Sequence, residues 1–240
     1  MSLVRGLAFL AEKQAATAHN LANVDTTSFK RRHAIAVEAK QDFQSVLQQT
    51  LPTITYAEQT DLQRGILRET GNNLDIAIDG PQWLRVQDAK GTRYYTRNGQ
   101  MQIGSDGRLL TRSGLTVLDQ NNQPITINSG ETAPSQLSIS PNGTIQNPNT
   151  GQTWGPIAVV SLAKPDALVP AGRGLYVDPL DQRGTQTGDA VQQGFLEGSN
   201  VDSLQELVQM ISVERSFAAT QKALTGMGRL QENLITNFLR

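Results

Sequence analysis

Residues 3–22 read LVRGLAFLAEKQAATAHNLA, a proline-free stretch whose seam positions recur at alternating spacings of four and three. These positions are Leu3, Leu7, Leu10, Gln14, Thr17 and Leu21. Such a spacing is typical of an α-helix that packs along one face. The stretch therefore predicts a helical rod roughly 30 Å long. A loop is expected over residues 20–28, because Asn23, Asp25 and Thr26 favour helix caps and turns.

A second helix is predicted at the other end of the chain, where the last 42 residues hold two glycines and no proline. Asp202 or Ser203 is expected to cap it, with Glu206 as the capping-box partner of Ser203. Gly226 and Gly228 predict a kink or a break. Its apolar side is formed by Leu204, Leu207, Val208, Ile211, Ala218, Leu224, Met227, Leu230, Leu234 and Phe238.

The middle of the chain predicts antiparallel β structure. All ten prolines lie between residues 52 and 179, and eighteen of the 21 glycines lie between 52 and 198. Short strands are expected at 74–78, 83–86, 115–118, 125–127, 137–139 and 157–162. Hairpin turns are expected at Asn98-Gly99, Asp106-Gly107 and Asn142-Gly143. No helical pattern of 10 to 15 residues separates these strands, which argues against a βαβ fold.

The predicted fold class is therefore α+β. The terminal helices pair as a coiled-coil-like unit, and an antiparallel β-rich domain is inserted between them, because a lone 20-residue helix is marginal in water. We expect a discontinuous helical assembly domain over 1–35 and 199–240. Residues 36–75 and 180–198 form a connecting extended region, and 76–179 form the β-rich outer domain. The pairing of the helices is expected within one chain or between copies, and the pattern does not decide between the two.

Composition excludes several classes of function. The chain has no cysteine, two histidines and a formal net charge of -1. It therefore has no disulfide framework, thiol nucleophile or cysteine-based metal site, and we expect no metal and no cofactor. The balanced charge gives no general attraction to nucleic acid. No apolar run approaches the roughly 20 residues that span a membrane, and no cleaved signal peptide is expected.

No residue pattern indicates catalysis, so no catalytic residue is assigned. Asp75 and Asp79 lie about 13 Å apart on a strand, too far for the carboxylate pair of a glycosidase. Residues 30–32, Lys-Arg-Arg, are interpreted as a solvated basic face. A cell-wall enzyme needs a buried acid, and no glutamate is placed in an apolar β context. A monomeric β-rich binding module, whose terminal helices form a private bundle, remains the alternative to an assembly protein.

Residues 20–30, NLANVDTTSFK, closely resemble the N-terminal signature of the bacterial flagellar rod and hook proteins. The family usually has glycine where this chain has Ser28, so a positive φ there would strain the serine. Three further blocks resemble the family in the same order along the chain: GNNLDIAIDG at 71–80 with WLRV at 83–86, YTRNG at 95–99 with DGRL at 106–109, and GFLEGSNV at 194–201 leading into LVQMI at 207–211.

The resemblance implies a non-catalytic structural subunit of the flagellar basal body. Copies would polymerise helically, together with other rod subunits, into the shaft that transmits torque across the periplasm. The surrounding ring proteins and the type III export apparatus are further expected partners, and export would leave no cleaved signal. The short connection from Lys30 to Gly71 favours a proximal rod subunit, with a distal rod subunit as the alternative.

The expected assembly interface follows from the seams and from the signature motif. Apolar residues of the two terminal helices are expected to pack within and between subunits, and the loop after the first helix is expected to contact an axial neighbour. The interface comprises Leu3, Leu7, Leu10, Leu21, Asn20, Asn23, Phe29, Leu204, Leu207, Val208, Ile211, Leu224, Leu234 and Phe238.

Overall fold

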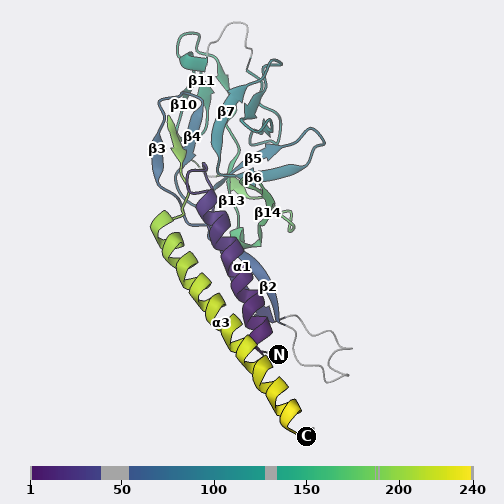
Figure 1. Ribbon diagram of the computed structural model, residues 1–240. Coiled ribbons are helices and arrows are strands. Elements are labelled where there is room, and N and C mark those ends of the chain that lie inside the picture. The colour runs from purple at the N-terminus through teal and green to yellow at the C-terminus, as the bar shows by residue number, and fades with distance from the viewer. Residues whose placement is uncertain (1, 39–53, 128–133, 187, 189, 239–240) are drawn as a thin grey trace. The chain divides into compact units, whose positions relative to one another are not determined.

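The computed structural model describes residues 2–38, 54–127, 134–186, 188 and 190–238. Within them the chain is α+β, with one long helix toward each end and a β-rich middle, as the sequence predicts (Figure 1). It divides into two compact units. The helical unit comprises Met1–Val24, Arg31–Asp61 and Val201–Arg240, and the β unit comprises Asp25–Lys30 and Leu62–Asn200. The division expected from the sequence, into a helical assembly domain, a connecting extended region and a β-rich outer domain, stays a prediction.

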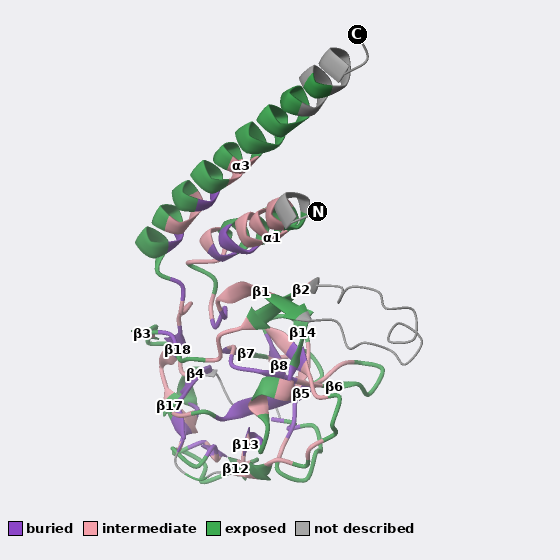
Figure 2. Ribbon diagram, turned by 90° about the horizontal axis from the view of Figure 1, so that it is seen from below, coloured by how far each residue is buried: buried purple, intermediate pink, exposed green. Residues whose placement is uncertain are grey.

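The helical unit is built from two helices and a β-hairpin. Helix α1 (Ser2–Ala22) and helix α3 (Ser203–Phe238) lie side by side and run in opposite directions (Figures 1 and 2). Strands β1 (Arg32–Glu38) and β2 (Ile54–Thr60) pair antiparallel and contact α1. The ring centroids of Phe9 and Tyr56 lie 5.6 Å apart, and the Tyr56 hydroxyl donates a 2.6 Å hydrogen bond to the Arg5 carbonyl.

The hairpin was not predicted, although its sequence carries a signal. Residues 32–37, RHAIAV, place the β-branched Ile35 and Val37 two residues apart, and β-branched residues are enriched in strands. The signal is short, and residues 39–53 that follow it lie outside the described residues. The hairpin matters because α1 packs against it on one side and against α3 on another, so α1 has two partners within its own chain.

The β unit is centred on an antiparallel sheet. The neighbouring strands, in order, are β14, β15, β6, β5, β9, β8, β7, β4 and β17, and β13 pairs with both β5 and β16. Smaller sheets pair β10 with β11 and β12, and β18 with β3. The strand bounds are β3 Leu67–Glu69, β4 Asp75–Ile78, β5 Trp83–Gln87, β6 Arg93–Thr96, β7 Gly99–Ile103, β8 Leu109–Thr111, β9 Thr116–Val117, β10 Ser138–Ile139, β11 Ile145–Gln146, β12 Thr153–Trp154, β13 Val159–Ser161, β14 Val169–Gly172, β15 Leu175–Val177, β16 Thr185–Gln186, β17 Val191–Gln193 and β18 Phe195–Glu197.

Two apolar clusters hold the β unit together. The larger cluster includes Ile76, Leu84 and Ile157, which are fully buried. A smaller cluster surrounds Trp83, whose ring packs edge-on against Tyr176 with the centroids 4.9 Å apart. Burying each such side chain contributes about 1.5 to 3 kcal/mol. The β unit therefore has a core of its own.

The strands follow the prediction more closely than the turns do. Expected strands at 74–78, 83–86 and 157–162 correspond to β4, β5 and β13. Asp106-Gly107 joins the paired strands β7 and β8, and Asn142-Gly143 joins β10 and β11. The hairpin expected at Asn98-Gly99 is wrong, because β6 pairs with β5 and β15 whereas β7 pairs with β4 and β8.

Gly99 has a different role from the expected turn. A Cβ atom there would lie 1.9 Å from the Ile76 carbonyl oxygen of β4, so only glycine allows the two strands to approach. Of the kink or break expected at Gly226 and Gly228, the break is wrong, because α3 continues from Ser203 to Phe238 as one helix. Two glycines lower the stability of a helix without ending it.

Candidate assembly interface

Asn20, the first residue of the signature motif, joins three elements of the helical unit. It lies near the end of α1, and its side-chain amide donates a 2.9 Å hydrogen bond to the Arg32 carbonyl. Its Oδ1 accepts a 2.9 Å hydrogen bond from the Arg32 backbone N–H. The same amide lies 3.3 Å from Oε2 of Glu206 on α3. A buried asparagine with these partners fixes the end of α1 against both β1 and α3.

Glu206 completes this arrangement instead of capping its own helix. The carboxylate is 1% exposed, and its Oε1 accepts a 2.5 Å hydrogen bond from Nε of Arg31. The cap of α3 is Asp202, whose Oδ1 accepts hydrogen bonds from the backbone N–H groups of Leu204 and Gln205. The predicted cap at Asp202 is confirmed, whereas the capping-box pairing of Glu206 with Ser203 is wrong. The Glu206 carboxylate binds Arg31 and Asn20 in the interior instead of the backbone of its own helix end.

The buried face of the α1–α3 pair is narrower and more polar than the expected seam. Ala16, Thr17 and Asn20 are buried on α1, and Glu206 and Val213 are buried on α3. Leu7, Leu10 and Leu21 are half-buried. Small and polar residues allow the helices to approach, but they contribute little apolar area. The coiled-coil geometry itself therefore stays a prediction.

One face of α3 presents an apolar surface to solvent near the start of the helix. Leu204 is 69% exposed, Val208 is 62% exposed and Ile211 is 51% exposed, with Leu207 beside them. At 3.6 residues per turn these side chains lie on the side of α3 opposite Glu206 and Val213. Together with Arg31, Leu204 and Val208 line a shallow cavity of about 500 Å³. We name Leu204, Leu207, Val208 and Ile211 the outer patch.

A second apolar surface lies beyond the part of α3 that pairs with α1. Helix α3 has 36 residues and α1 has 21, so at 1.5 Å per residue their lengths are about 54 Å and 32 Å. The Asn20–Glu206 contact fixes the end of α1 beside the start of α3, and α3 therefore continues past the start of α1 (Figure 1). We name residues 224–238 the overhang.

The overhang carries exposed aliphatic side chains. Leu224, Met227, Leu230 and Leu234 are between 40% and 64% exposed, and Figure 2 shows this part of α3 as exposed wherever it is described. By helical periodicity, Leu224 and Met227 continue the side of α3 that buries Val213 against its neighbours. The apolar stripe of α3 thus extends beyond the start of α1, the helix against which its first part packs.

The second half of the signature motif belongs to the β unit. Ser28 has φ +56°, the left-handed conformation that glycine adopts without strain. Its N–H donates to the Glu197 carbonyl at 2.8 Å, and its hydroxyl donates to the Arg97 carbonyl at 2.8 Å. The condition under which the serine would be strained is therefore met. Two buried hydrogen bonds hold the serine in this conformation.

Buried charges anchor the same segment, and we name Lys30, Arg97 and Glu197 the buried triad. Lys30 Nζ lies 2.6 Å from Oε1 of Glu197, and Arg97 Nε lies 2.6 Å from its Oε2. All three side chains are at most 2% exposed. The Gly65 N–H also donates to Oε1 at 3.1 Å. Three further N–H groups of the Arg97 guanidinium donate to the carbonyls of Ile78, Gly80 and Gln82.

The buried triad corrects two interpretations made from the sequence. Residues 30–32 are not a solvated basic face, because Lys30 is buried, Arg31 binds Glu206 and Arg32 binds Glu58 at 3.0 Å. A glutamate does lie buried on a strand, namely Glu197 on β18. Both of its carboxylate oxygens already accept hydrogen bonds from protein donors, so the geometry is that of a structural anchor rather than a catalytic acid. Strand alternation did not reveal it, because β18 has only three residues.

The residues predicted for the interface fall into distinct environments. The side chains of Leu3 and Phe238 lie outside the described residues. Asn20 is buried, and Asn23 donates a 2.8 Å hydrogen bond from its amide to the His19 carbonyl at the end of α1. Phe29 is buried within the β unit. The helix positions Leu204, Leu207, Val208, Ile211, Leu224 and Leu234 are exposed. Their contact with other subunits stays a proposal.

Comparison with known proteins assigns the family. Residues 77–147 match the D1 domain of the flagellar hook protein FlgE/F/G, and residues 192–237 match the C-terminal domain of the flagellar basal-body rod proteins FlgEFG. The chain is 32% identical to the flagellar basal-body rod protein FlgF of Salmonella typhimurium over 227 residues, which cover 90% of this chain and 88% of that protein. The chain belongs to the flagellar basal-body rod family.

Other rod-family relatives span nearly the whole chain. The basal-body rod protein FlgG of Bacillus subtilis is 29% identical over 263 residues, covering 97% of this chain and 96% of that protein. FlgF of Rhizobium meliloti is 32% identical, with coverages of 83% and 80%. The relatives are structural rod proteins and not enzymes. Rod-family membership places the chain in the flagellar basal body and implies assembly with other rod subunits.

The described residues add two negative findings. No helix among them combines the length and the apolar character that crossing a membrane requires. The same residues contain no group of three or more histidine, aspartate or glutamate side chains placed to hold a metal ion.

Proposed function

We propose that this chain is a structural subunit of the proximal flagellar rod, which polymerises helically with copies of itself and with other rod subunits. In this proposal the terminal helices form the inner tube of a shaft that transmits torque across the periplasm, and the β unit forms the outer layer. The observation that carries the proposal is the overhang of α3. An apolar stripe that extends past its partner needs a second partner.

Packing within one chain does not account for the apolar side chains of the overhang or for the stability of this part of the helix. Helices of about 15 residues are marginal in water without packing. Leu224, Met227 and Leu230 are at least 40% exposed, and burying each would contribute about 1.5 to 3 kcal/mol. Packing against α1 or α3 of a neighbouring copy would supply that burial. Repeated along a polymer, such contacts make a stiff shaft from modest interactions.

The outer patch supplies a second contact on the opposite side of α3. Leu204, Val208 and Ile211 recur at spacings of four and three, which is the pattern of a packed helix face. The two apolar surfaces point to different sides of one helix. A subunit with two such surfaces is able to contact two neighbours at once, as helical polymerisation requires.

The assignment to the proximal rod rests on the length of one connecting segment. The connection from Lys30 to Gly71 is short, which favours the proximal class over the distal class. We further propose that the subunit is exported by the flagellar type III apparatus without cleavage of a signal, and that ring proteins surround the assembled shaft. Expression of the chain in strains of its source bacterium that lack the FlgF-type or the FlgG-type protein tests the position. Restored motility only in the FlgG-deficient strain would place the chain in the distal rod.

The assembly claim is tested by substitutions on the overhang. Leu230→Asp places a charge on the apolar stripe, whereas Gln221→Asp introduces the same charge away from both apolar surfaces. Expressed in cells that lack the native protein, the Leu230→Asp chain should be absent from purified basal bodies, and the Gln221→Asp chain should be present. Both purified chains should give the same circular dichroism. Normal incorporation of Leu230→Asp would refute the role of the overhang.

A further inference from the structure

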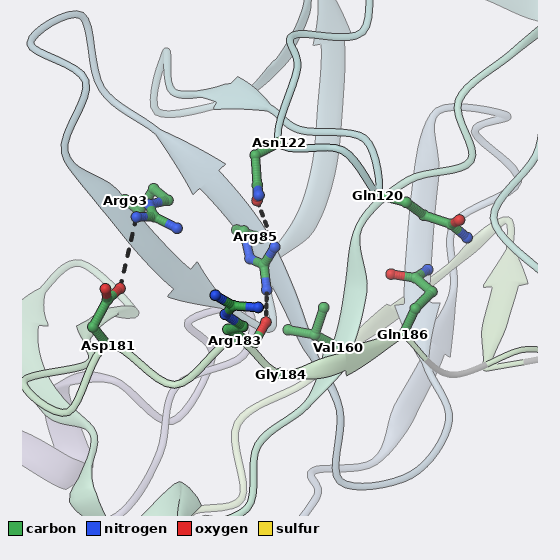
Figure 3. Close-up of a pocket in the computed structure, with 9 residues that line it drawn as sticks. All are labelled: Arg85, Arg93, Gln120, Asn122, Val160, Asp181, Arg183, Gly184 and Gln186. Carbon is green, nitrogen blue, oxygen red and sulfur yellow. Dashed lines mark hydrogen bonds and ion pairs between the residues drawn. The ribbon is translucent and has the colours of Figure 1, made fainter.

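The β unit contains a cationic cavity that the assembly proposal does not use. It has a volume of about 430 Å³ and lies between β5, β13, β16 and the loop segments around Asn122 and Arg183 (Figure 3). Three arginines line it, namely Arg85, Arg93 and Arg183, together with a single aspartate, Asp181. The other polar lining groups are neutral amides, including Gln120 and Gln186. The lining therefore carries an excess of positive charge.

Arg85 is the central feature of this cavity. Its side chain comes from β5 and is 4% exposed. Nη1 donates a 2.5 Å hydrogen bond to Oδ1 of Asn122, and Nη2 donates a 2.6 Å hydrogen bond to the Arg183 carbonyl (Figure 3). The guanidinium carbon lies 5.9 Å from the centre of the Tyr95 ring. Its Nε is shielded from solvent and has no hydrogen-bond partner within the described chain.

These partners of Arg85 are all neutral. Within the described residues, no carboxylate lies within 4 Å of its guanidinium. A buried cation without a counter-ion is costly, because desolvation is not offset by an opposite charge. The buried triad of the same unit shows the usual solution, in which Arg97 meets Glu197 at 2.6 Å. Arg85 lacks such a partner and instead lines an open cavity.

The backbone around Arg85 is built to keep the guanidinium in place. Gly184 has φ +63°, and a Cβ atom there would lie 3.0 Å from Cβ of Val160 and 3.3 Å from Nη2 of Arg85. Asn122, which holds Nη1, also adopts a positive φ of +62°. Asn122 is fixed in its turn by a 3.0 Å hydrogen bond from its N–H to the Asp119 carbonyl, so the acceptor of Nη1 has a defined position. The hydrogen bonds to Asn122 and to the Arg183 carbonyl thus hold the Arg85 head group in place.

We propose that this cavity binds an oxyanion, either a phosphate or a carboxylate group, with Arg85 as the buried counter-charge and Arg93 and Arg183 at the mouth. The guanidinium fork matches the geometry of both groups. The only described acid at the mouth, Asp181, is exposed and lies 3.6 Å from Nη2 of Arg93. An exposed pair of this kind contributes little, so Arg93 is able to exchange Asp181 for the anion. Arg85 and Arg183 have no carboxylate within 4 Å among the described residues. The oxyanion comes either from a free anion or from an acidic side chain of a neighbouring subunit.

The binding step is tested on the isolated protein, independently of any assembly. Inorganic phosphate is titrated at constant ionic strength, with chloride as the balancing anion, and backbone amide shifts are followed by NMR. We expect saturable shifts at Gly184 and Gln186 below about 100 mM phosphate, a range that includes weak affinities. Arg93→Gln combined with Arg183→Gln should weaken binding at least about tenfold, which corresponds to about 1.4 kcal/mol. Arg85 is left unchanged, because its removal threatens the fold.

The control variant combines Arg68→Gln with Arg112→Gln, which removes the same two charges from exposed arginines that do not line the cavity. It should leave the phosphate affinity within about twofold of that of the unchanged chain. Shifts that do not saturate, or that persist equally in the double variant, would overturn the proposal for either source of the anion. Failure here would leave the rod assignment untouched, because the cavity does not include the outer patch or the overhang.

Arginine labelling with phenylglyoxal then distinguishes the two sources. Arg183 labelling is compared in the isolated chain with and without phosphate, and in purified basal bodies washed free of phosphate. Protection by phosphate in the isolated chain, with Arg183 labelled in washed basal bodies, identifies a free anion. Protection of Arg183 in washed basal bodies while Arg112 still reacts identifies a neighbouring carboxylate. If phosphate does not protect Arg183 in the isolated chain, the cavity is not the oxyanion site.

Discussion

Lys30 Nζ and Glu197 Oε1 lie 2.6 Å apart with both side chains at most 1% exposed, although 167 residues separate them in the chain. This ion pair ties residues 25–30, the end of the signature motif, to strand β18 of the β unit. The motif therefore serves two units: Asn20 organises the helical unit, and Lys30 anchors the β unit. The signature residues Asn20 and Lys30 therefore have roles in folding within the chain.

Glu197→Gln should strongly destabilise the β unit. The substitution preserves shape but leaves Lys30 and Arg97 as buried cations without a counter-ion. Removing one partner of a buried pair costs about 3 to 5 kcal/mol. Urea unfolding followed by tryptophan fluorescence reports this loss, because Trp83 lies in the β core. Glu69→Gln on the paired strand β3 is exposed and should change stability by less than about 0.5 kcal/mol. Equal stability of both variants would contradict the anchoring role.

Ser28 should respond unusually to replacement by alanine and glycine. Alanine loses the hydrogen bond to the Arg97 carbonyl and keeps the left-handed strain, which destabilises the β unit by about 1 kcal/mol. Glycine relieves the strain of about 1 to 2 kcal/mol, so the Ser28→Gly chain should be more stable than Ser28→Ala. Ser105 is exposed and has an ordinary φ, so the Ser105→Ala chain should be more stable than the Ser105→Gly chain. Thermal unfolding of the four variants measures both orders.

Asn20→Ala should loosen the helical unit while the β unit stays folded. The substitution removes two hydrogen bonds to the Arg32 backbone and one to Glu206, and we expect a loss of about 2 kcal/mol. Far-UV circular dichroism of the helices reports it. Glu12→Ala, at an exposed position of the same helix, serves as the control. Unchanged helical stability after Asn20→Ala would show that Asn20 does not stabilise the helical unit.

Leu7→Asp should prevent incorporation into the rod and leave the β unit folded. Leu7 is half-buried on α1, where a carboxylate disrupts packing within the helical unit and against neighbours. Ala11→Asp introduces the same charge at an exposed position of α1. Immunoblots of purified basal bodies should contain the Ala11→Asp chain and lack the Leu7→Asp chain. A rod of normal composition from Leu7→Asp would exclude this seam position from assembly.

The sequence predicted those features that local chemistry determines. The terminal helices, the cap at Asp202 and the turns at Asp106 and Asn142 follow from residue types within a few positions. The buried triad could not be predicted in this way, because its members are distant in the chain. Lys30 and Arg97 lie outside the helices and strands, and Glu197 ends a strand of three residues. The turn assigned to Asn98-Gly99 failed for a related reason: the glycine is required by the approach of Ile76 from another strand.

Hydrogen exchange over residues 224–234 of α3 tests whether the overhang needs a neighbouring subunit. We expect rapid amide exchange in a dilute, confirmed monomer, because every described side chain of this segment is exposed. The same amides should become strongly protected in assembled rods, while the β strands are protected in both states. Strong protection of residues 224–234 already in the monomer would contradict the account and indicate a self-sufficient helical bundle.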